Sequence, residues 1–522
     1  MKSIVQLSKE NGFRCLTIAI VCLLLFCNLV YYFKQCHSHA FIAFFSLICL
    51  SVIAVVALTS LRIIDIKSTR FFAVVFLVSG IVFVVLFNPG AVPDEFYHYY
   101  SSYLYSDLFC GGSIDWDNKL IQMRSSDANL PMSAELSYQS IASVFSQIGV
   151  TDGNDSFTMK EVSATIFDLG TNPIYVKFPS ALALSICRFI GADPVITFYC
   201  GRVANFLLLW GLACAAVHIT PVGKTIFKTV CLLPMMLHVG ASYSYDTGTI
   251  GLTFFATALV LKIWMGEKEP SVRLLCFSVL AFAMLAPCKV VYSLVVIIAL
   301  LVPLNRFGSS KQAYAYKIVV CAACVLSILI MRLPSILSLV GPVSTQVSNG
   351  TVDDAAIAPY YSMGDAISSP LYTLWLFFNT FVCKGDFYIK SIVGGSLGWF
   401  QANIIAPNYF VIAYILLLVF ALIRDDDDSR LLDKRFRLAA FTIAGLVWLA
   451  VMISMYLAWT ANTSPTIEGV QGRYLLPVLP LLALSLRGER LSFSGSLLRG
   501  IIPTVVFVNA IYLMHIMAIV LA

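Results

Sequence analysis

Charged residues are scarce in this 522-residue chain. Asp, Glu, Lys and Arg make up only 12% of the sequence, whereas 59% of the residues are hydrophobic and the mean hydropathy is +0.87. Soluble domains contain about 25% charged residues, so this composition excludes an ordinary soluble protein. We expect an all-α integral membrane protein that contacts membrane lipids and has no nucleic-acid partner.

The chain also lacks a disulfide pattern and a cleavable signal. Most of the 15 cysteines lie inside apolar runs, where they serve as small packing residues. Residues 11–33 are long enough to span a membrane and have no small-residue cleavage site behind a short apolar core. We therefore expect neither a disulfide framework nor removal of the first segment.

Long apolar runs predict a bundle of about thirteen transmembrane helices, because a helix needs about 20 apolar residues to cross a bilayer. The runs lie near residues 13–33, 40–61, 70–88, 196–219, 225–242, 247–265, 273–287, 289–304, 316–334, 407–424, 438–458, 473–487 and 500–521. Residues 1–69 form an N-terminal two-helix addition, residues 70–490 form the core, and residues 491–522 carry the last helix.

The distribution of cations predicts the orientation of these helices. With the N-terminus in the cytoplasm, most of the 34 Lys and Arg residues fall in short inner loops, as is typical of proteins in the cell membrane. The polar stretch 89–195, here called the large loop, then lies outside. The acidic run Asp425–Asp428 lies inside, where we expect a solvated loop.

Three segments outside the spans have less certain paths. The run Leu371–Cys383 is short, and Gly394–Gly398 cannot form a stable helix, so residues 371–406 are expected to be re-entrant or surface-lying, with two short crossings as the alternative. In the large loop, Asp94–Phe109 and Ile174–Gly191 are predicted to be surface-lying helices. The first carries six aromatic residues between Phe96 and Tyr105, which suit either stacking on sugars or a membrane interface.

The large loop begins with Asn88–His98, which has the features of a proton-transfer site. Pro93 suits the first position of a helix, and the helix N-terminus then favours the ionised carboxylates of Asp94 and Glu95. His98 lies four residues after Asp94 and shares its helix face. Asp94, Glu95 and His98 are therefore the predicted catalytic residues.

Further polar residues lie at the predicted outer ends of the spans. Ionisable groups in such positions are costly and often mark a site, and cations there can bind phosphate. Each one alone can also be a contact with lipid headgroups. The predicted substrate-binding or phosphate-binding residues are Lys177, Arg202, Tyr245, Asp246, Lys289, Gln471 and Arg473.

No cofactor and no metal site are predicted. The large loop has one Asp-x-Asp sequence, Asp115-Trp116-Asp117, whose spacing suits a divalent cation. A metal ligand set normally needs more donors than these two carboxylates. A divalent cation is therefore an alternative that the sequence does not favour.

Five motifs occur in order along the chain. They are Pro93-Asp94-Glu95-x-x-His98, Tyr175-x-Lys177-x-Pro179, Ser244-Tyr245-Asp246, Gly395-x-Leu397-Gly398-Trp399 and Gln471-Gly472-Arg473-Tyr474-Leu475-x-Pro477. Together they resemble a family of bacterial polytopic membrane proteins grouped with the GT-C glycosyltransferase superfamily, over roughly residues 85–490. Val92 departs from that pattern, because the family often has a second proline there.

The resemblance implies an inverting glycosyltransferase that acts at the outer face. Such enzymes transfer a sugar from a polyprenyl-phosphate donor, here to a cell-envelope glycan or a lipid-linked acceptor. By this resemblance Asp94 is the base, Glu95 is its competitor for that role, and Arg473 and Lys289 contact the phosphate. The alternative is a transporter or flippase of lipid-linked saccharides, which would favour charges at the bilayer midplane and internal repeats; the sequence shows neither pattern.

Overall fold

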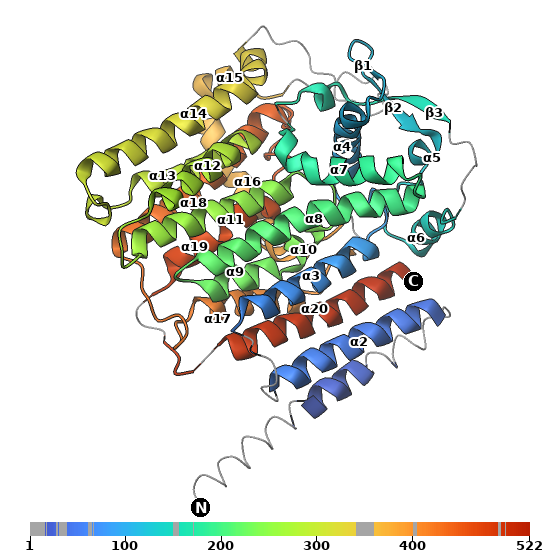
Figure 1. Cartoon of the computed structure of the whole chain (residues 1–522), viewed down its shortest axis with the longest axis horizontal. Coiled ribbons are helices and arrows are strands. Elements are labelled where there is room, and N and C mark those ends of the chain that lie inside the picture. The colour runs from blue at the N-terminus through green and yellow to red at the C-terminus, as the bar shows by residue number, and fades with distance from the viewer. Residues whose placement is uncertain are drawn as a thin grey trace, which may run out of the picture.

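The computed structural model describes residues 16–30, 39–60, 65–149, 156–340, 360–399, 404–488 and 492–521, apart from positions 17, 28, 29, 66, 171 and 496. Helices dominate this part of the chain, and a small antiparallel sheet lies at one end of the bundle (Figure 1). The first predicted span, residues 13–33, is described only in part and includes the apolar helix Ile18–Cys27.

The helices and strands fall into three groups. The longer helices are α2 (His39–Ser60), α3 (Thr69–Leu86), α8 (Pro194–Ile219), α11 (Asp246–Met265), α12 (Val272–Cys288), α14 (Ser310–Val340), α16 (Pro370–Val393), α17 (Asn408–Leu422), α18 (Lys434–Ala458) and α20 (Leu498–Leu521). Shorter helical segments connect them: α9 (Lys224–Cys231), α10 (Pro234–Gly240), η2 (Val290–Val295), α13 (Val296–Leu300), η3 (Leu304–Arg306), α15 (Met363–Ser368), η5 (Gly472–Val478) and α19 (Leu479–Leu486). The large loop contains α4 (Glu95–Cys110), β1 (Ile114–Asp115), β2 (Leu120–Arg124), α5 (Ser125–Ala128), α6 (Tyr138–Phe145), β3 (Phe157–Glu161), η1 (Ala164–Phe167) and α7 (Ile174–Phe189).

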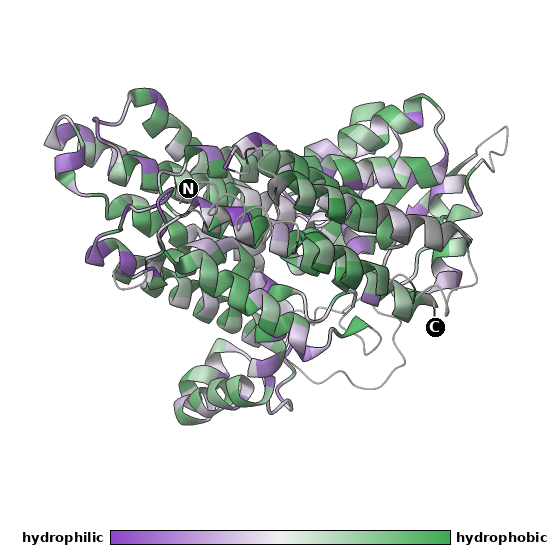
Figure 2. Cartoon of the chain, turned by 90° about the horizontal axis from the view of Figure 1, so that it is seen from below, coloured by the Kyte–Doolittle hydropathy of each residue, from purple (hydrophilic) through white to green (hydrophobic). Residues whose placement is uncertain are grey.

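Six helices in the described part are long and apolar enough to cross a membrane. They are α3, α8, α11, Ser310–Leu333 of α14, α18 and Arg499–Val520 of α20. Several shorter apolar helices lie among them, and hydrophobic residues cover most of the helix lengths (Figure 2). The structure supports a helical membrane protein, while the total of thirteen crossings stays a prediction.

Local sequence explains where several of these helices begin. The side chains of Ser68, Asp193 and Asp433 accept hydrogen bonds from the first backbone N–H groups of α3, α8 and α18. Those N–H groups have no partner within the helix, so a short polar side chain stabilises them. Pro194 follows Asp193 at the first helical position, where its missing N–H costs nothing.

Three of the predicted spans are not continuous helices. Residues 225–242 form α9 and α10, residues 289–304 include η2 and α13, and residues 473–487 form η5 and α19. Pro234 opens α10 and Pro477 lies inside η5, and proline interrupts the hydrogen bonds of an α-helix. Irregular backbone at membrane depth is tolerated where protein buries it, and Gly472–Val478 is largely buried.

The large loop folds around its own core, which the sequence did not reveal. Strands β1, β2 and β3 pair antiparallel in that order. Tyr99, Tyr103 and Tyr105 of α4 are buried in or beside this core. Three of the six aromatic residues between Phe96 and Tyr105 are thus core residues, available neither to sugars nor to a membrane interface. The sheet is held by Arg124, which pairs with Asp127 at 2.7 Å.

Helix α7 runs beside α8, and the two helices are in extensive contact (Figure 1). Its other side exposes a row of apolar residues at helical spacing, Ile174, Phe178, Leu182 and Ile186. The buried face of α7 packs against α8. The prediction that this helix lies on the membrane stays a prediction, and the exposed apolar row is compatible with it.

Residues 370–393 form one unbroken helix, α16, which is longer than the apolar run Leu371–Cys383; whether it is re-entrant, surface-lying or crosses the membrane stays a prediction. Its charged residues are paired rather than disruptive: Lys384 contacts Glu468 at 2.6 Å and Lys390 contacts Asp386 at 2.7 Å. The helix ends at Gly394, which adopts φ 97°, a left-handed conformation that suits glycine. The glycine-rich segment after it is irregular, as predicted.

The acidic run Asp425–Asp428 is a structural junction, so the prediction of a solvated loop is wrong. Asp428 is buried, pairs with Arg487 at 2.9 Å and accepts a hydrogen bond from the N–H of Gly223 at 2.6 Å. Asp425 and Asp426 accept hydrogen bonds from the backbone that precedes α20, and Asp427 pairs with Lys67 before α3. The carboxylates therefore join four segments that are distant in sequence.

Replacing Arg487 by Met should lower the thermal stability of the protein, because it leaves the buried carboxylate of Asp428 without its cation. Breaking a buried ion pair costs about 3–5 kcal/mol. The matched control is Arg430→Met, because Arg430 pairs with Glu267 in an exposed position where a pair contributes about 0–1 kcal/mol. Thermal unfolding in detergent, followed by size-exclusion chromatography, measures both; equal melting temperatures would contradict the structural role of Asp428.

Candidate active site

Glu95 and Arg202 form a buried ion pair at the start of the large loop. Both side chains are fully buried, and Nε and Nη2 of Arg202 donate to the two carboxylate oxygens of Glu95 at 2.8 and 2.5 Å. Glu95 also accepts hydrogen bonds from the N–H groups of Gly90 and Tyr243, at 2.9 and 3.3 Å. Both carboxylate oxygens of Glu95 therefore already accept hydrogen bonds from N–H groups of the chain itself.

The other N–H groups of Arg202 hold the end of α3. Nη1 donates to the carbonyl oxygens of Val84, at 3.1 Å, and Phe87, and Nη2 donates to that of Asn88 at 3.0 Å. The last carbonyls of a helix lack partners within it, and a cation there is favourable. All five N–H groups of Arg202 are used, so the geometry assigns Arg202 and Glu95 structural roles in place of the predicted phosphate-binding and catalytic ones.

The turn between α3 and α4 is also held by the Gly-x-Leu-Gly-Trp motif. The indole N–H of Trp399 donates to the carbonyl of Gly90 at 2.8 Å, and the N–H of Gly398 donates to Nε2 of His238 at 3.1 Å. Gly398 adopts φ 65°, which glycine tolerates without strain. The motif thus supports the turn. Trp399 and His238 were not among the predicted site residues, although Trp399 stands in a quoted motif.

Asp94 lies next to Glu95 but points elsewhere. It occupies the position before α4 with φ 63° and ψ 12°, a left-handed conformation that is uncommon outside glycine. Such strain is found mainly at functional sites. Its side chain is 56% exposed, and Oδ2 lies 3.1 Å from Nη2 of Arg473. The helix begins at Glu95, so the placement of Pro93 and Asp94 inside the first turn is wrong.

A second ion pair joins Asp246 and Lys289 at 2.6 Å, with both side chains mostly buried. The amino group of Lys289 lies over the rings of Tyr245 and Tyr474, 4.9 and 4.7 Å from their centroids. The guanidinium of Arg473 lies 5.5 Å from the same Tyr474 ring. Cations are attracted to aromatic faces, so Tyr474 links the two pairs.

We call Asp94, Arg473, Asp246 and Lys289 the four-charge cluster. Both carboxylates act electrostatically on Arg473, which agrees with their placement around one site. The structure brings these four residues, which are distant in sequence, into one cluster. Tyr474 was missed, although it follows Arg473 directly in a quoted motif and aromatic rings are regular partners of cations.

His98 and Lys177 are buried beside the four-charge cluster. Nζ of Lys177 lies 3.3 Å from Nδ1 of His98 and donates to the carbonyls of His98 and Tyr243 at 3.2 and 3.0 Å. Burial lowers the pKa of Lys177 to about 7. Burial also lowers the pKa of His98 well below its ordinary value, and the charges of Lys177, Lys289 and Arg473 lower it further. Lys177 is thus engaged with the chain itself and orients His98.

Two polar atoms near the four-charge cluster have no hydrogen-bond partner. Nε of Arg473 and Oε1 of Gln471 are among several buried side-chain atoms of the described residues that lack one. Buried polar atoms are usually paired, so these two atoms can bind a ligand only if the surrounding side chains give access to them. The ring of Tyr245 contacts that of the sequence-distant His98, with 5.0 Å between the ring centroids.

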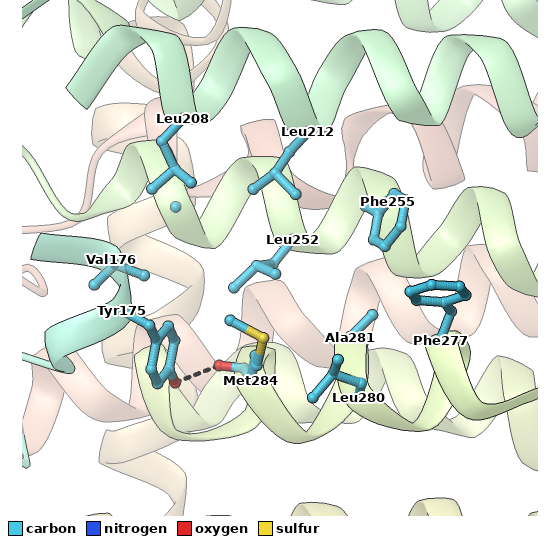
Figure 3. A pocket seen from close by; sticks show the side chains of 11 residues that line it. Tyr175, Val176, Leu208, Leu212, Leu252, Phe255, Phe277, Leu280, Ala281 and Met284 are labelled. Carbon is cyan, nitrogen blue, oxygen red and sulfur yellow. Dashed lines mark hydrogen bonds between the residues drawn. The ribbon is translucent and has the colours of Figure 1, made fainter. Parts of the chain in front are cut away.

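An apolar cavity of about 120 Å³ lies between α7, α8, α11 and α12 (Figure 3). Tyr175 lines one end and Phe277 the other, and aliphatic side chains lie between them. Gly248 in its wall follows Asp246 by two residues, and Tyr175 precedes Lys177 by two. The cavity is therefore close in sequence to residues of the charged site, although no charged residue lines it.

The residues that the structure describes include no candidate metal site. No group of three or more His, Cys, Asp or Glu residues there is placed to hold an ion. Asp115 of the Asp-x-Asp sequence accepts hydrogen bonds from the N–H groups of Asp117 and Asn118, at 3.1 and 2.9 Å, and from the side chain of Asn118. Its carboxylate shapes the turn between β1 and β2.

The fold and the site together define a helical membrane protein with two coupled ion pairs beside a folded loop. The chain belongs to the family described as "Predicted membrane protein (DUF2142)", whose model matches residues 76–482. The match includes every residue of the four-charge cluster and begins after α2. No curated protein and no solved structure matches the chain.

Neutralising Glu95 should lower the stability of the protein, whereas neutralising Asp94 should leave it nearly unchanged. Glu95→Gln weakens a buried, fully hydrogen-bonded pair, so we expect a loss of stability of about 3–5 kcal/mol. Asp94→Asn removes an exposed carboxylate, so the melting temperature should stay within a few degrees of the wild type. Thermal unfolding of the two purified variants measures this; a stable Glu95→Gln variant would overturn the structural role.

The buried Lys177 should make stability depend on pH. Its pKa is about 7 in the folded protein and 10.5 at its ordinary value, so between these values the unfolded chain binds a proton that the folded chain does not. Stability should therefore rise with pH across this window. Melting temperatures of the wild type, Lys177→Met and the exposed-lysine control Lys268→Met, taken from pH 7 to 10, test this. The rise should be smaller in Lys177→Met than in the wild type and unchanged in Lys268→Met.

Proposed function

We propose that this protein is a membrane glycosyltransferase of the GT-C superfamily. It transfers a sugar from a polyprenyl-phosphate donor to a cell-envelope glycan or lipid-linked acceptor at the outer face, with inversion at the anomeric carbon. The observation that carries the proposal is the exposed carboxylate of Asp94, 3.1 Å from Arg473 in the four-charge cluster.

Asp94 serves as the general base in this proposal. It takes the proton from an acceptor hydroxyl while that oxygen bonds to the anomeric carbon and the bond from that carbon to the phosphate oxygen breaks. General-base assistance of this kind contributes about 10²–10⁴-fold to the rate. Of the three predicted catalytic residues, Asp94 alone has an exposed side chain, whereas Glu95 and His98 are buried.

Arg473 and Lys289 stabilise the departing phosphate. The electron pair of the broken bond leaves with the lipid phosphate, and cations held in place lower the energy of that charge. The free Nε of Arg473 and the partly exposed amino group of Lys289 are the available donors. A phosphate that binds Arg473 also competes with Asp94 for it, which frees the carboxylate to act as a base.

The apolar cavity suits a short part of the lipid chain of the donor. Its lining is almost entirely hydrocarbon, from Tyr175 to Phe277, and Lys289 directly follows α12, which forms one of its walls. The acceptor would then approach from the side of the exposed Asp94. This division matches a reaction between one membrane-bound and one water-exposed substrate.

The test is sugar transfer by the purified protein in lipid vesicles, with radiolabelled polyprenyl-phosphate sugars screened as donors. Asp94→Asn should reduce transfer by about 10²–10⁴-fold without loss of folded protein. The control is Asp117→Asn, which removes an exposed carboxylate elsewhere in the large loop and should keep full activity. Full activity in Asp94→Asn would rule out this mechanism.

A transporter or flippase of lipid-linked saccharides is the second candidate. Discontinuous helices such as η2–α13 and η5–α19 are also typical of transporters. The same vesicles distinguish the two functions. Movement of the lipid-linked sugar between leaflets without any transfer product would favour transport.

A further inference from the structure

A second cavity, of about 690 Å³, lies between α2, α3 and α20, away from the four-charge cluster. Figure 1 shows α20 between α2 and α3, with the three helices along one edge of the bundle. The cavity is lined mainly by aliphatic side chains, which include Val52, Val74, Val78, Val506 and Leu513. It lies where the N-terminal helix α2 meets α3 and α20; the family match includes part of α3 and none of α20.

The cavity has one charged end. Asp65, Ser68 and Arg70 line it at the start of α3, whereas the residues further along that helix are apolar apart from Ser79. Arg70 is exposed and forms no ion pair with the described residues, while the neighbouring Lys67 is paired with Asp427. An unpaired arginine in the first turn of a helix is a favourable partner for an anion.

The length of the cavity fits a membrane lipid. It follows α3 from Arg70 to Phe83, which at 1.5 Å per residue is about 20 Å. One leaflet of a bilayer has a hydrocarbon thickness of about 15 Å, so the cavity has the reach of an acyl chain with its headgroup at Arg70. A hydrocarbon lining with a cation at one end is complementary to a lipid phosphate followed by its chains.

We propose that a glycerophospholipid of the surrounding membrane occupies this cavity. Its phosphate binds the guanidinium of Arg70, and its acyl chains fill the space between α2, α3 and α20. The lipid thereby joins the N-terminal helix α2 to the rest of the bundle. On the predicted orientation of the chain, it comes from the cytoplasmic leaflet. This site is separate from the proposed active site and does not depend on it.

Native mass spectrometry of the full-length protein, extracted in a mild detergent, tests the proposal. The wild type should retain a bound phospholipid. Val78→Trp fills the cavity and should abolish retention, whereas Val85→Trp, on the same helix but outside the cavity lining, should not. Arg70→Gln should weaken retention by about tenfold, the value of a charge-assisted hydrogen bond, and Arg273→Gln, an exposed arginine in the first turn of α12, should have no effect.

A second measurement covers the case in which Val78→Trp fails to fold. Phosphatidylethanolamine, phosphatidylglycerol or diacylglycerol is added to delipidated protein, and the melting temperature is recorded. Phospholipids should raise it in the wild type, diacylglycerol should not, and the rise should be small in Arg70→Gln. Retention of detergent, quinone or sterol in place of phospholipid, equal retention in the cavity-filling variant, or an equal response of Arg70→Gln and wild type would each overturn the proposal.

Discussion

The buried pair between Glu95 and Arg202 is the interaction on which the geometry of the site depends. It joins the last carbonyls of α3, the turn after it, the start of α4 and the backbone at Tyr243 before α11. Burying two charges is costly unless hydrogen bonds satisfy all of them, and here each donor and acceptor is engaged. The turn is therefore fixed, and it leaves Asp94 in a left-handed, exposed position that a free helix N-terminus would not impose.

The remaining charges reach the site from interrupted helices. Lys289 precedes η2 and Arg473 lies in η5, so both cations stand where the backbone departs from a regular helix. Tyr474 and Tyr245 cover the amino group of Lys289, and the carboxylates neutralise both cations. The site thus holds charges in a largely apolar protein by pairing each of them, while a few polar atoms of Arg473 and Gln471 remain available.

Much of the candidate site could be predicted from sequence, because charges at the ends of apolar runs are rare enough to stand out. When these runs are placed in a membrane, Asp94, Asp246, Lys289 and Arg473 fall at the same depth, near the predicted outer face. The roles of adjacent residues could not be separated in this way. Asp94 and Glu95 have the same chemistry and the same local sequence, and only the contact of Glu95 with Arg202, which is 107 residues away, distinguishes them.

The sequence alone determined the class of this protein, because hydropathy and the scarcity of charge are sums over local composition. It also indicated most of the long helices. Only the tertiary structure decided that Asp425–Asp428 is a junction in which Asp425 and Asp428 are buried, that the large loop contains a sheet, and that Arg202 caps α3. The physical reason is the same in each case: the free energy of a polar side chain depends on its partner, and these partners lie far along the chain, where local pattern carries no information about them.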